Sequence, residues 1–235
     1  SLVMAAEGPT ALLGRTTWEG GAEAVYEAPI PSRNVVLPLT ARDVYSHTSV
    51  LWLQNTDRTG RNEVLVEAFQ ANGGLQNSWT VTLDPAESGP LDLYYEMDFA
   101  SLPINAANGY LGSFRLSAEA PIAVMAYGDE PQGRGAAAVA ARPATAAAEV
   151  QYLPYVRATT TEGDSLIAIA NVATRAVDVT ITYSGGSDSP GGAGQSFDQS
   201  FSIAGRSQAF VDLDRRLGRG NRPVPNLPAW GFVGS

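Results

Sequence analysis

Cysteine and lysine are both missing from this sequence of 235 residues. Without cysteine the chain forms no disulfide and offers no thiolate to a metal ion. Without lysine it has no amine for Schiff-base chemistry and no partner for a lysine–asparagine isopeptide crosslink. A protein of this composition has to be held together by packing, by β-ladders or by assembly with other chains.

Positive charge and long apolar segments are also scarce. The net charge is −9, and phosphate binding needs a concentrated positive surface, so nucleic acid is not an expected partner. No apolar run reaches the roughly 18 residues of a membrane-spanning helix, and no basic, apolar leader is present. One group of arginines lies in a Gly/Pro-rich loop, where we interpret it as a solvated surface feature: Arg215, Arg216, Arg219 and Arg222.

The sequence contains one histidine, His47. Catalysis of the Ser-His-Asp or Cys-His type needs a base that titrates near neutral pH, and His47 lies in a polar loop that we interpret as surface. A carboxylate pair for glycoside hydrolysis is recognised by the distance between its two carboxyl groups in space, so the sequence leaves this possibility open. Two acidic pairs could bind calcium, although neither spacing is a recognised calcium loop: Asp212 with Asp214, and Glu162 with Asp164. We expect no enzyme activity and no cofactor, with calcium as a weak alternative.

Short apolar segments bounded by turn residues fill almost the whole sequence. No stretch holds a sustained 3.6-residue apolar period between helix caps, so we predict an all-β fold. About seven strands fall in each unit of roughly a hundred residues, which is the size of an immunoglobulin-like sandwich.

Residues 35–55 align without a gap on residues 151–171, at an offset of 116. In both copies a strand that ends in Leu-Pro leads through a polar loop to a strand that is apolar on both faces, as in a covered strand. Each copy ends on an asparagine, Asn55 or Asn171. We predict that this side chain closes a turn by hydrogen bonding to nearby backbone.

A second match joins the front of the chain to its middle. Residues 1–15 carry the pattern of residues 113–127 at an offset of 112, with Glu7 on Glu119 and Pro9 on Pro121. A proline inside a strand fits an edge or a bend, so we expect the strand to bend at Pro9. Residues 231–235 repeat residues 109–113, and in the middle of the chain that motif continues directly into 113–127.

The second repeat is therefore expected to lack its last strands, while a spare copy of them stands at the front of the sequence. We predict a donor segment at 1–16, a first β-sandwich at 17–128 that is closed by its own strands 113–127, a Gly/Ala/Pro-rich linker at 129–149 with one short strand near 138–141, and an incomplete second sandwich at 150–235. The hypothesis is that the donor segment completes the second sandwich of a neighbouring molecule, a form of β-augmentation.

These motifs resemble the tandem immunoglobulin-like β-sandwich repeats of bacterial extracellular and cell-surface proteins. Leu37-Pro38, the strand that ends at Asn55, and Gly112-Ser113 recur in the second half of the chain. The ends that are out of phase resemble donor-strand-complemented fibre subunits, such as pilins of the chaperone–usher kind. The chain departs from those pilins in having two units and no cysteine pair. The resemblance implies an extracellular or cell-surface homopolymer, a structural filament.

The hypothesis names interface residues on both sides. On the donor strand they are Leu2, Val3, Met4, Ala6, Ala11, Leu12 and Leu13. On the acceptor edge they are Gly231, Phe232, Val233 and Gly234. Within the donor we expect the buried side chains to be Leu2, Met4, Ala11 and Leu13.

Two alternatives stay open. The sequence could be a window of a longer covalent array of repeats, in which the same sandwich forms without a subunit boundary. It could also be an adhesive or carbohydrate-binding module, with a surface glycan as partner and tryptophans as a sugar platform: Trp18, Trp52, Trp79 or Trp230. The apolar strands around Trp52 and Trp79 favour core positions for these two.

Overall fold

The computed structural model describes residues 13–17, 23–42, 48–70, 72–92, 110–129, 136–151, 156–158, 165–187, 189, 193–213, 222, 227 and 232–234. In these residues the regular structure is β throughout apart from one 3-10 turn, Ala144–Ala146, which confirms the all-β prediction. Two compact units are present. Unit 1 comprises Ser1–Gln70 and Gly74–Ala147, and unit 2 comprises Ala71–Gly73 and Ala148–Ser235.

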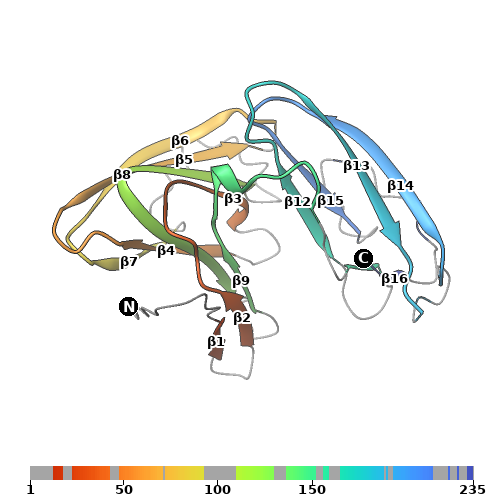
Figure 1. The fold of residues 1–235 in the computed structure, drawn as a ribbon, viewed down its shortest axis with the longest axis horizontal. Coiled ribbons are helices and arrows are strands. Elements are labelled where there is room, and N and C mark those ends of the chain that lie inside the picture. The colour runs from red at the N-terminus through yellow and green to blue at the C-terminus, as the bar shows by residue number, and fades with distance from the viewer. Residues whose placement is uncertain are drawn as a thin grey trace. The chain divides into compact units, whose positions relative to one another are not determined.

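The strands of unit 1 are β1 Leu13–Thr17, β2 Glu23–Glu27, β3 Ser32–Arg42, β4 Thr48–Asn55, β5 Asn62–Gln70, β6 Leu75–Leu83, β7 Ser88–Asp92, β8 Tyr110–Asp129, β9 Ala136–Ala140 and β10 Arg142–Pro143. Those of unit 2 are β11 Val156–Ala158, β12 Leu166–Ala170, β13 Val177–Ser184, β14 Ser196–Ile203, β15 Gln208–Asp212 and β16 Phe232–Gly234 (Figure 1). All the strand pairs are antiparallel.

Unit 1 is organised around the long strand β8. Its first part, up to Ala118, lies between β5 and β3, and β6 and β10 extend the layer beyond them. From Ile122 onward, β8 pairs with β4 and then also with β9, while β7 pairs with the other side of β4. A single strand is thus central to both layers, and it changes layer at residues 119–121.

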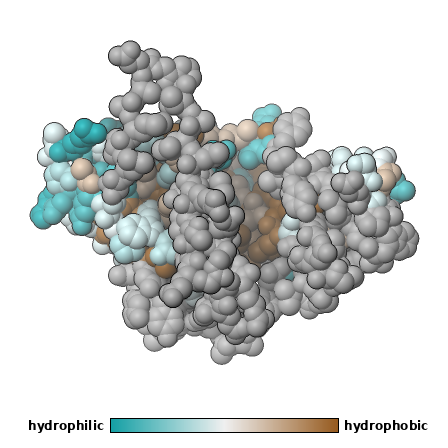
Figure 2. All heavy atoms as spheres, turned by 90° about the horizontal axis from the view of Figure 1, so that it is seen from below, coloured by the Kyte–Doolittle hydropathy of each residue, from teal (hydrophilic) through white to brown (hydrophobic). Residues whose placement is uncertain are grey.

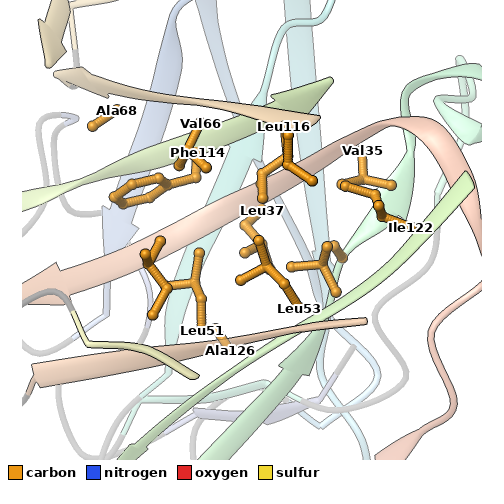
Figure 3. Close-up of a cluster of buried hydrophobic side chains, with 14 of the residues drawn as sticks. Val35, Leu37, Leu51, Leu53, Val66, Ala68, Phe114, Leu116, Ile122 and Ala126 are labelled. Atoms are coloured by element: carbon orange, nitrogen blue, oxygen red, sulfur yellow. The ribbon is translucent and has the colours of Figure 1, made fainter. Parts of the chain in front are cut away.

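The core lies between these two layers. Alternate side chains of β8 point inward, since Phe114 and Leu116 in the first layer and Ile122, Val124 and Ala126 in the second are all buried. Figure 3 shows Phe114, Leu116, Ile122 and Ala126 among buried side chains from β3, β4 and β5. Burial of each large apolar side chain contributes about 1.5–3 kcal/mol, so β8 supplies much of the stability of the unit.

The two tryptophans that the structure describes differ in their environment. Trp79 on β6 is partly buried against the core and makes an edge-to-face contact with Phe114, with ring centroids 5.9 Å apart. Trp52 is 38% exposed, so the prediction of a core position was wrong. The reason is strand alternation: Leu51 and Leu53 on either side of Trp52 are buried and place it on the outer face. Trp18 and Trp230 lie outside the described residues.

The Ala-rich segment at 129–149 was predicted as a linker, but part of it belongs to unit 1. β9 lies beside the second part of β8, with Ala140 opposite Met125, and Arg142 of β10 pairs with β3. Small side chains do not prevent strand formation here because β8 offers a free edge for the ladder. The short strand predicted near 138–141 is β9, which the structure places at Ala136–Ala140.

The asparagine prediction is confirmed in both units. The Asn55 side-chain Nδ2 donates to the carbonyl oxygens of Gly60 (2.9 Å) and Asp84 (3.0 Å), and its Oδ1 accepts from the Asp57 N–H at 3.1 Å. Asn171 likewise donates to Arg175, Ile203 and Ala204 and accepts from Ala173. Both asparagines are buried, so each one holds two turns together by satisfying their backbone groups.

Replacing Asn55 therefore has a predictable effect on stability. Asn55→Ala is expected to lower the free energy of unfolding of unit 1 by about 2–3 kcal/mol, because buried backbone groups lose their partners. Hydrogen–deuterium exchange, resolved by peptide mass in the full chain, reports the loss in β4 and β5. Asn34→Ala, at an exposed position, is the matched control and should change stability by less than about 0.5 kcal/mol. Equal exchange in the two variants would contradict the role of Asn55.

Candidate functional site

Unit 2 repeats the strand pairs of unit 1 in the same register. Leu166 on β12 faces Asp212 on β15 just as Val50 on β4 faces Asp92 on β7. On β13, Val177 faces Ile203 of β14, as Asn62 on β5 faces Leu83 of β6. β12, β13, β14 and β15 are thus the counterparts of β4, β5, β6 and β7.

The agreement extends to the backbone of the turns. Ala86 and Arg206 are the described non-glycine residues with positive φ, at 57° and 59°. Ala86 follows the end of β6 at the same spacing as Arg206 follows the end of β14. The Ala86 N–H donates to the Asp57 carbonyl oxygen, and the Arg206 N–H donates to the Ala173 carbonyl oxygen, both at 2.8 Å. Two units that share such an uncommon conformation at one position have the same local fold.

β16 corresponds to the first residues of β8. Gly234 faces Val156 of β11, and Gly112 faces Thr40 of β3 at the same place in the ladder. Three of the predicted acceptor residues, Phe232, Val233 and Gly234, form this strand. The fourth, Gly231, lies outside the described residues. In unit 1 the same strand runs on through residues 113–129, between four other strands.

The position that β8 fills in unit 1 is open in the described part of unit 2. Among those residues β12 pairs with β15 alone and β13 pairs with β14 alone, so the unit consists of three separate two-stranded ribbons, β11–β16, β12–β15 and β13–β14. In unit 1 both corresponding strands, β4 and β5, pair with β8 on their other side. Isolated two-stranded ribbons are marginal in water.

Apolar side chains line this open position. Two of them, Ile169 and Ile181, are partly buried and pack against the core of unit 2. The third, Val179, is half-buried. Their counterparts in unit 1 are fully covered by β8: Leu53, Val64 and Val66. Unit 2 thus presents an apolar surface with two strand edges, a combination that favours pairing with a further strand. The predicted acceptor should therefore include β12 and β13, which the sequence did not point to.

Among the described residues, each unit has one buried tyrosine, whose hydroxyl stays protonated. Tyr183 is buried at the end of β13 and its hydroxyl donates to Gln199 Oε1 at 2.9 Å. Burial raises the pKa of this hydroxyl, which keeps it protonated. In unit 1 burial also raises the pKa of the Tyr110 hydroxyl, which donates to the Phe69 carbonyl oxygen at 2.9 Å.

The ladder between β1 and β2 is antiparallel and has the same length as the ladder between the end of β8 and β9. Leu13 faces Glu27 in the first, and Met125 faces Ala140 in the second. The end of the predicted donor segment therefore has the same local structure as the strand that it repeats. Leu13 lies in β1, whereas the rest of the predicted donor residues lie outside the described part: Leu2, Val3, Met4, Ala6, Ala11 and Leu12.

The burial of β8 changes which donor side chains we expect to face the core. Its inward residues correspond, 112 positions earlier, to Leu2, Met4, Thr10, Leu12 and Gly14. Ala11 and Leu13 correspond instead to Ala123 and Met125, which alternate with the buried positions. Of the four donor side chains predicted from the sequence to be buried, Leu2 and Met4 still align with inward positions of β8. Leu12 now joins them, whereas Ala11 and Leu13 align with the outer face.

Among the described residues, the other candidates are not brought together in a second site. Asp212 is buried within β15, and the structure describes neither Asp214, Glu162, Asp164 nor His47. Arg222, predicted as solvated, instead places its guanidinium 5.3 Å from the Phe201 ring centroid and donates to the Ser202 carbonyl oxygen at 3.0 Å. The remaining arginines of that group, Arg215, Arg216 and Arg219, lie outside the described residues.

Within the described residues no group of acidic, histidine or cysteine side chains is arranged to hold a metal ion, and no helix is long and apolar enough to cross a membrane. The face of the molecule in Figure 2 shows both apolar and polar residues among the coloured ones. No protein-family model, curated protein or solved structure matches the chain. Unit 1 is therefore the reference against which unit 2 is interpreted.

The open position should be visible in hydrogen exchange. In dissociated subunits, the amides of residues 166–170 and 177–184 are expected to exchange faster than those of β4 and β5, because among the described residues each of these two strands is paired along one edge. Peptide-resolved mass spectrometry of the full chain measures the two sets together, so unit 1 serves as the internal control. Equal protection in the two units would show that another segment already pairs with β12 and β13.

Proposed function

We propose that this protein is a structural subunit of an extracellular filament or surface assembly, which polymerises head to tail by strand donation. In this proposal both units are immunoglobulin-like sandwiches, and residues 1–17 of one copy take the place in unit 2 of the next copy that residues 113–129 take in unit 1. The observation that carries the proposal is the single partner of β12 and of β13 in the described residues. β8 pairs with both equivalent strands in unit 1.

The donor segment has side chains that suit the open position. Leu2, Met4 and Leu12 replace Phe114, Leu116 and Val124 of β8, and each would contribute roughly 1.5–3 kcal/mol by burial. Association opposes this with about 4–15 kcal/mol, so docking is favourable only if the strand pairs along its full length. Once docked, it leaves only by breaking the whole ladder, which makes the joint kinetically persistent.

The donated element extends beyond the strand itself. Because β1–β2 repeats the hairpin of β8 and β9, β2 would extend the second layer of the neighbouring unit as β9 does in unit 1. Ile30 supports this: its side chain is 52% exposed, whereas Pro143, which follows β9 at the equivalent spacing, is buried. Ile30 would become covered if β2 followed the donor strand into the joint. Within one chain β2 lies beside β9, and Glu27 accepts a hydrogen bond from Arg142 Nη2 at 2.8 Å, so these contacts would be exchanged for those of the neighbouring unit.

The same proposal assigns the protein no catalytic role, no cofactor and no nucleic-acid partner, and it places the assembly outside the cell. Support comes from the composition, which has neither lysine nor cysteine, and from the resemblance to surface-protein repeats. The principal partner is a second copy of the same chain.

One observation favours a second candidate, an adhesive or carbohydrate-binding module of a longer covalent repeat protein. Trp52 is 38% exposed on the outer face of unit 1, between Pro90 and Met125 in the ladder. An exposed aromatic face is a surface on which sugars stack. The mass of the denatured polypeptide separates the two candidates, because about 25 kDa supports donation and a much larger mass supports a covalent array.

Removal of residues 1–15 should abolish polymerisation and leave unit 1 folded, because β8 closes that unit. The inward substitution Leu12→Asp should raise the concentration needed for assembly by at least about 100-fold, since an unpaired carboxylate would be buried. Electron microscopy and light scattering of the purified protein measure filament formation, and circular dichroism measures folding.

Ala11→Asp is the matched control for this substitution. Its side chain lies next to Leu12 but corresponds to a position on the outer face, so assembly should change little. Long filaments from the truncated chain would refute strand donation. Equal loss of assembly in the two aspartate variants would show that the donor does not dock in the register of β8.

Self-complementation gives an independent test. We expect a chain that lacks residues 1–15 at its front, and carries a copy of residues 2–17 directly after Ser235, to be monomeric. Its unit 2 should be as protected from hydrogen exchange as unit 1, because the added strand continues β16 as residues 113–129 continue the start of β8. Analytical ultracentrifugation and exchange mass spectrometry report the two properties. A monomer in which β12 and β13 still exchange rapidly would contradict the proposed position of the donor.

A further inference from the structure

Two side chains hold the bend of β8 in unit 1. Asn62 Nδ2 donates to the Ala120 carbonyl oxygen at 2.9 Å, and its Oδ1 accepts from the Ala120 N–H at 3.1 Å. Thr56 donates twice to the Pro121 carbonyl oxygen, from its N–H at 3.3 Å and from its hydroxyl at 2.7 Å. We call these two residues the bend clamp.

The bend needs such a clamp because β8 leaves one ladder before it enters the next. Its pairing with β5 ends at Ala118, and its pairing with β4 starts at Ile122. Backbone groups between these points have no strand opposite them, and an unpaired backbone group is costly where water is excluded. Asn62, which is only 1% exposed, supplies a donor and an acceptor in the manner of a neighbouring strand.

Unit 2 has valine at both clamp positions. Val177 faces Ile203 where Asn62 faces Leu83, and Val172 follows Asn171 as Thr56 follows Asn55. A valine side chain forms no hydrogen bond. The backbone N–H of Val172 is still available to a docked strand, because no described residue accepts a hydrogen bond from it.

We propose, on the basis of the strand-donation function above, that Val172 and Val177 set the lifetime of the joint between subunits. In the alignment of the donor with β8, Gly8 and Pro9 take the places of Ala120 and Pro121, and unit 2 offers these places the Val172 N–H and no side-chain clamp. Glycine suits a bend without a clamp since it adopts bent conformations without steric cost. The built-in strand β8 is held by three side-chain hydrogen bonds that the valines of unit 2 cannot form, two from Asn62 and one from the Thr56 hydroxyl. A donor from solution therefore exchanges at unit 2 and does not displace β8.

The test transfers the clamp to unit 2 in the full-length chain. Val172→Thr restores the hydroxyl donor, Val177→Asn restores the amide, and the double variant restores both. Because the chain has no cysteine, Asn34→Cys gives one labelling site at an exposed position. Mixing filaments that carry two different fluorophores then measures the exchange of subunits by energy transfer.

The double variant is expected to lengthen the exchange half-life by about tenfold or more, and each single variant by less. The control is Ala176→Asn, which adds the same amide one residue away at an exposed position and should leave the half-life unchanged. Val172→Thr changes the side-chain volume little and keeps the test valid if Val177→Asn does not fold.

The two levels of the proposal fail in different ways. If the parent protein forms no filaments, strand donation is wrong. If the parent filaments exchange subunits and the folded clamp variants exchange at the same rate or faster, strand donation stands and the assignment of Val172 and Val177 is overturned. An equal lengthening by Ala176→Asn would also overturn it, because the effect would then not depend on the bend.

Discussion

Backbone pairing along one strand is the constraint on which the rest of this structure depends. β8 of unit 1 is central in both layers, so it satisfies edges of β3, β4, β5 and β9 at once and contributes Phe114, Leu116, Ile122 and Val124 to the core. A sandwich can lose an edge strand and keep its two layers. It cannot lose a central strand without dividing each layer, because hydrogen bonds and apolar contacts are lost together.

In the described part of unit 2 no strand takes the place that residues 113–129 have in unit 1. The turns, the registers and the buried asparagine are those of unit 1, yet its described strands form three ribbons with no ladder between them. Local structure therefore survives where hydrogen bonds join residues close in sequence, such as Asn171 with Ala173 and Arg175. The ladders absent from the described residues of unit 2 are the long-range ones, which in unit 1 join β8 to β4 and β5.

Much of this architecture could be predicted from local patterns, and some of it could not. The all-β class, the asparagine turns and the repeat follow from the spacing of apolar and turn residues, which acts within a few positions. The strand character of residues 136–140 was weak in the sequence because alanine is a poor strand former, and it depends on the edge that β8 offers. Trp52 was predicted to be buried because it lies in an apolar segment. In such a segment the sequence does not show which face of the strand points to the core until the partner layer is known. The clamp by Asn62 joins residues 58 positions apart, and no local signal marks it.

The amino-acid order by itself determined that two similar units exist and that residues 1–15 share a pattern with residues 113–127, since repetition is a property of the order alone. Only the tertiary structure decided what residues 113–127 do in unit 1. It showed that they form a central strand of two layers, which of their side chains face the core, and which strands of unit 2 have an open edge in the described residues. These facts depend on contacts between distant parts of the chain, where burial and backbone pairing decide between arrangements that local patterns leave equivalent.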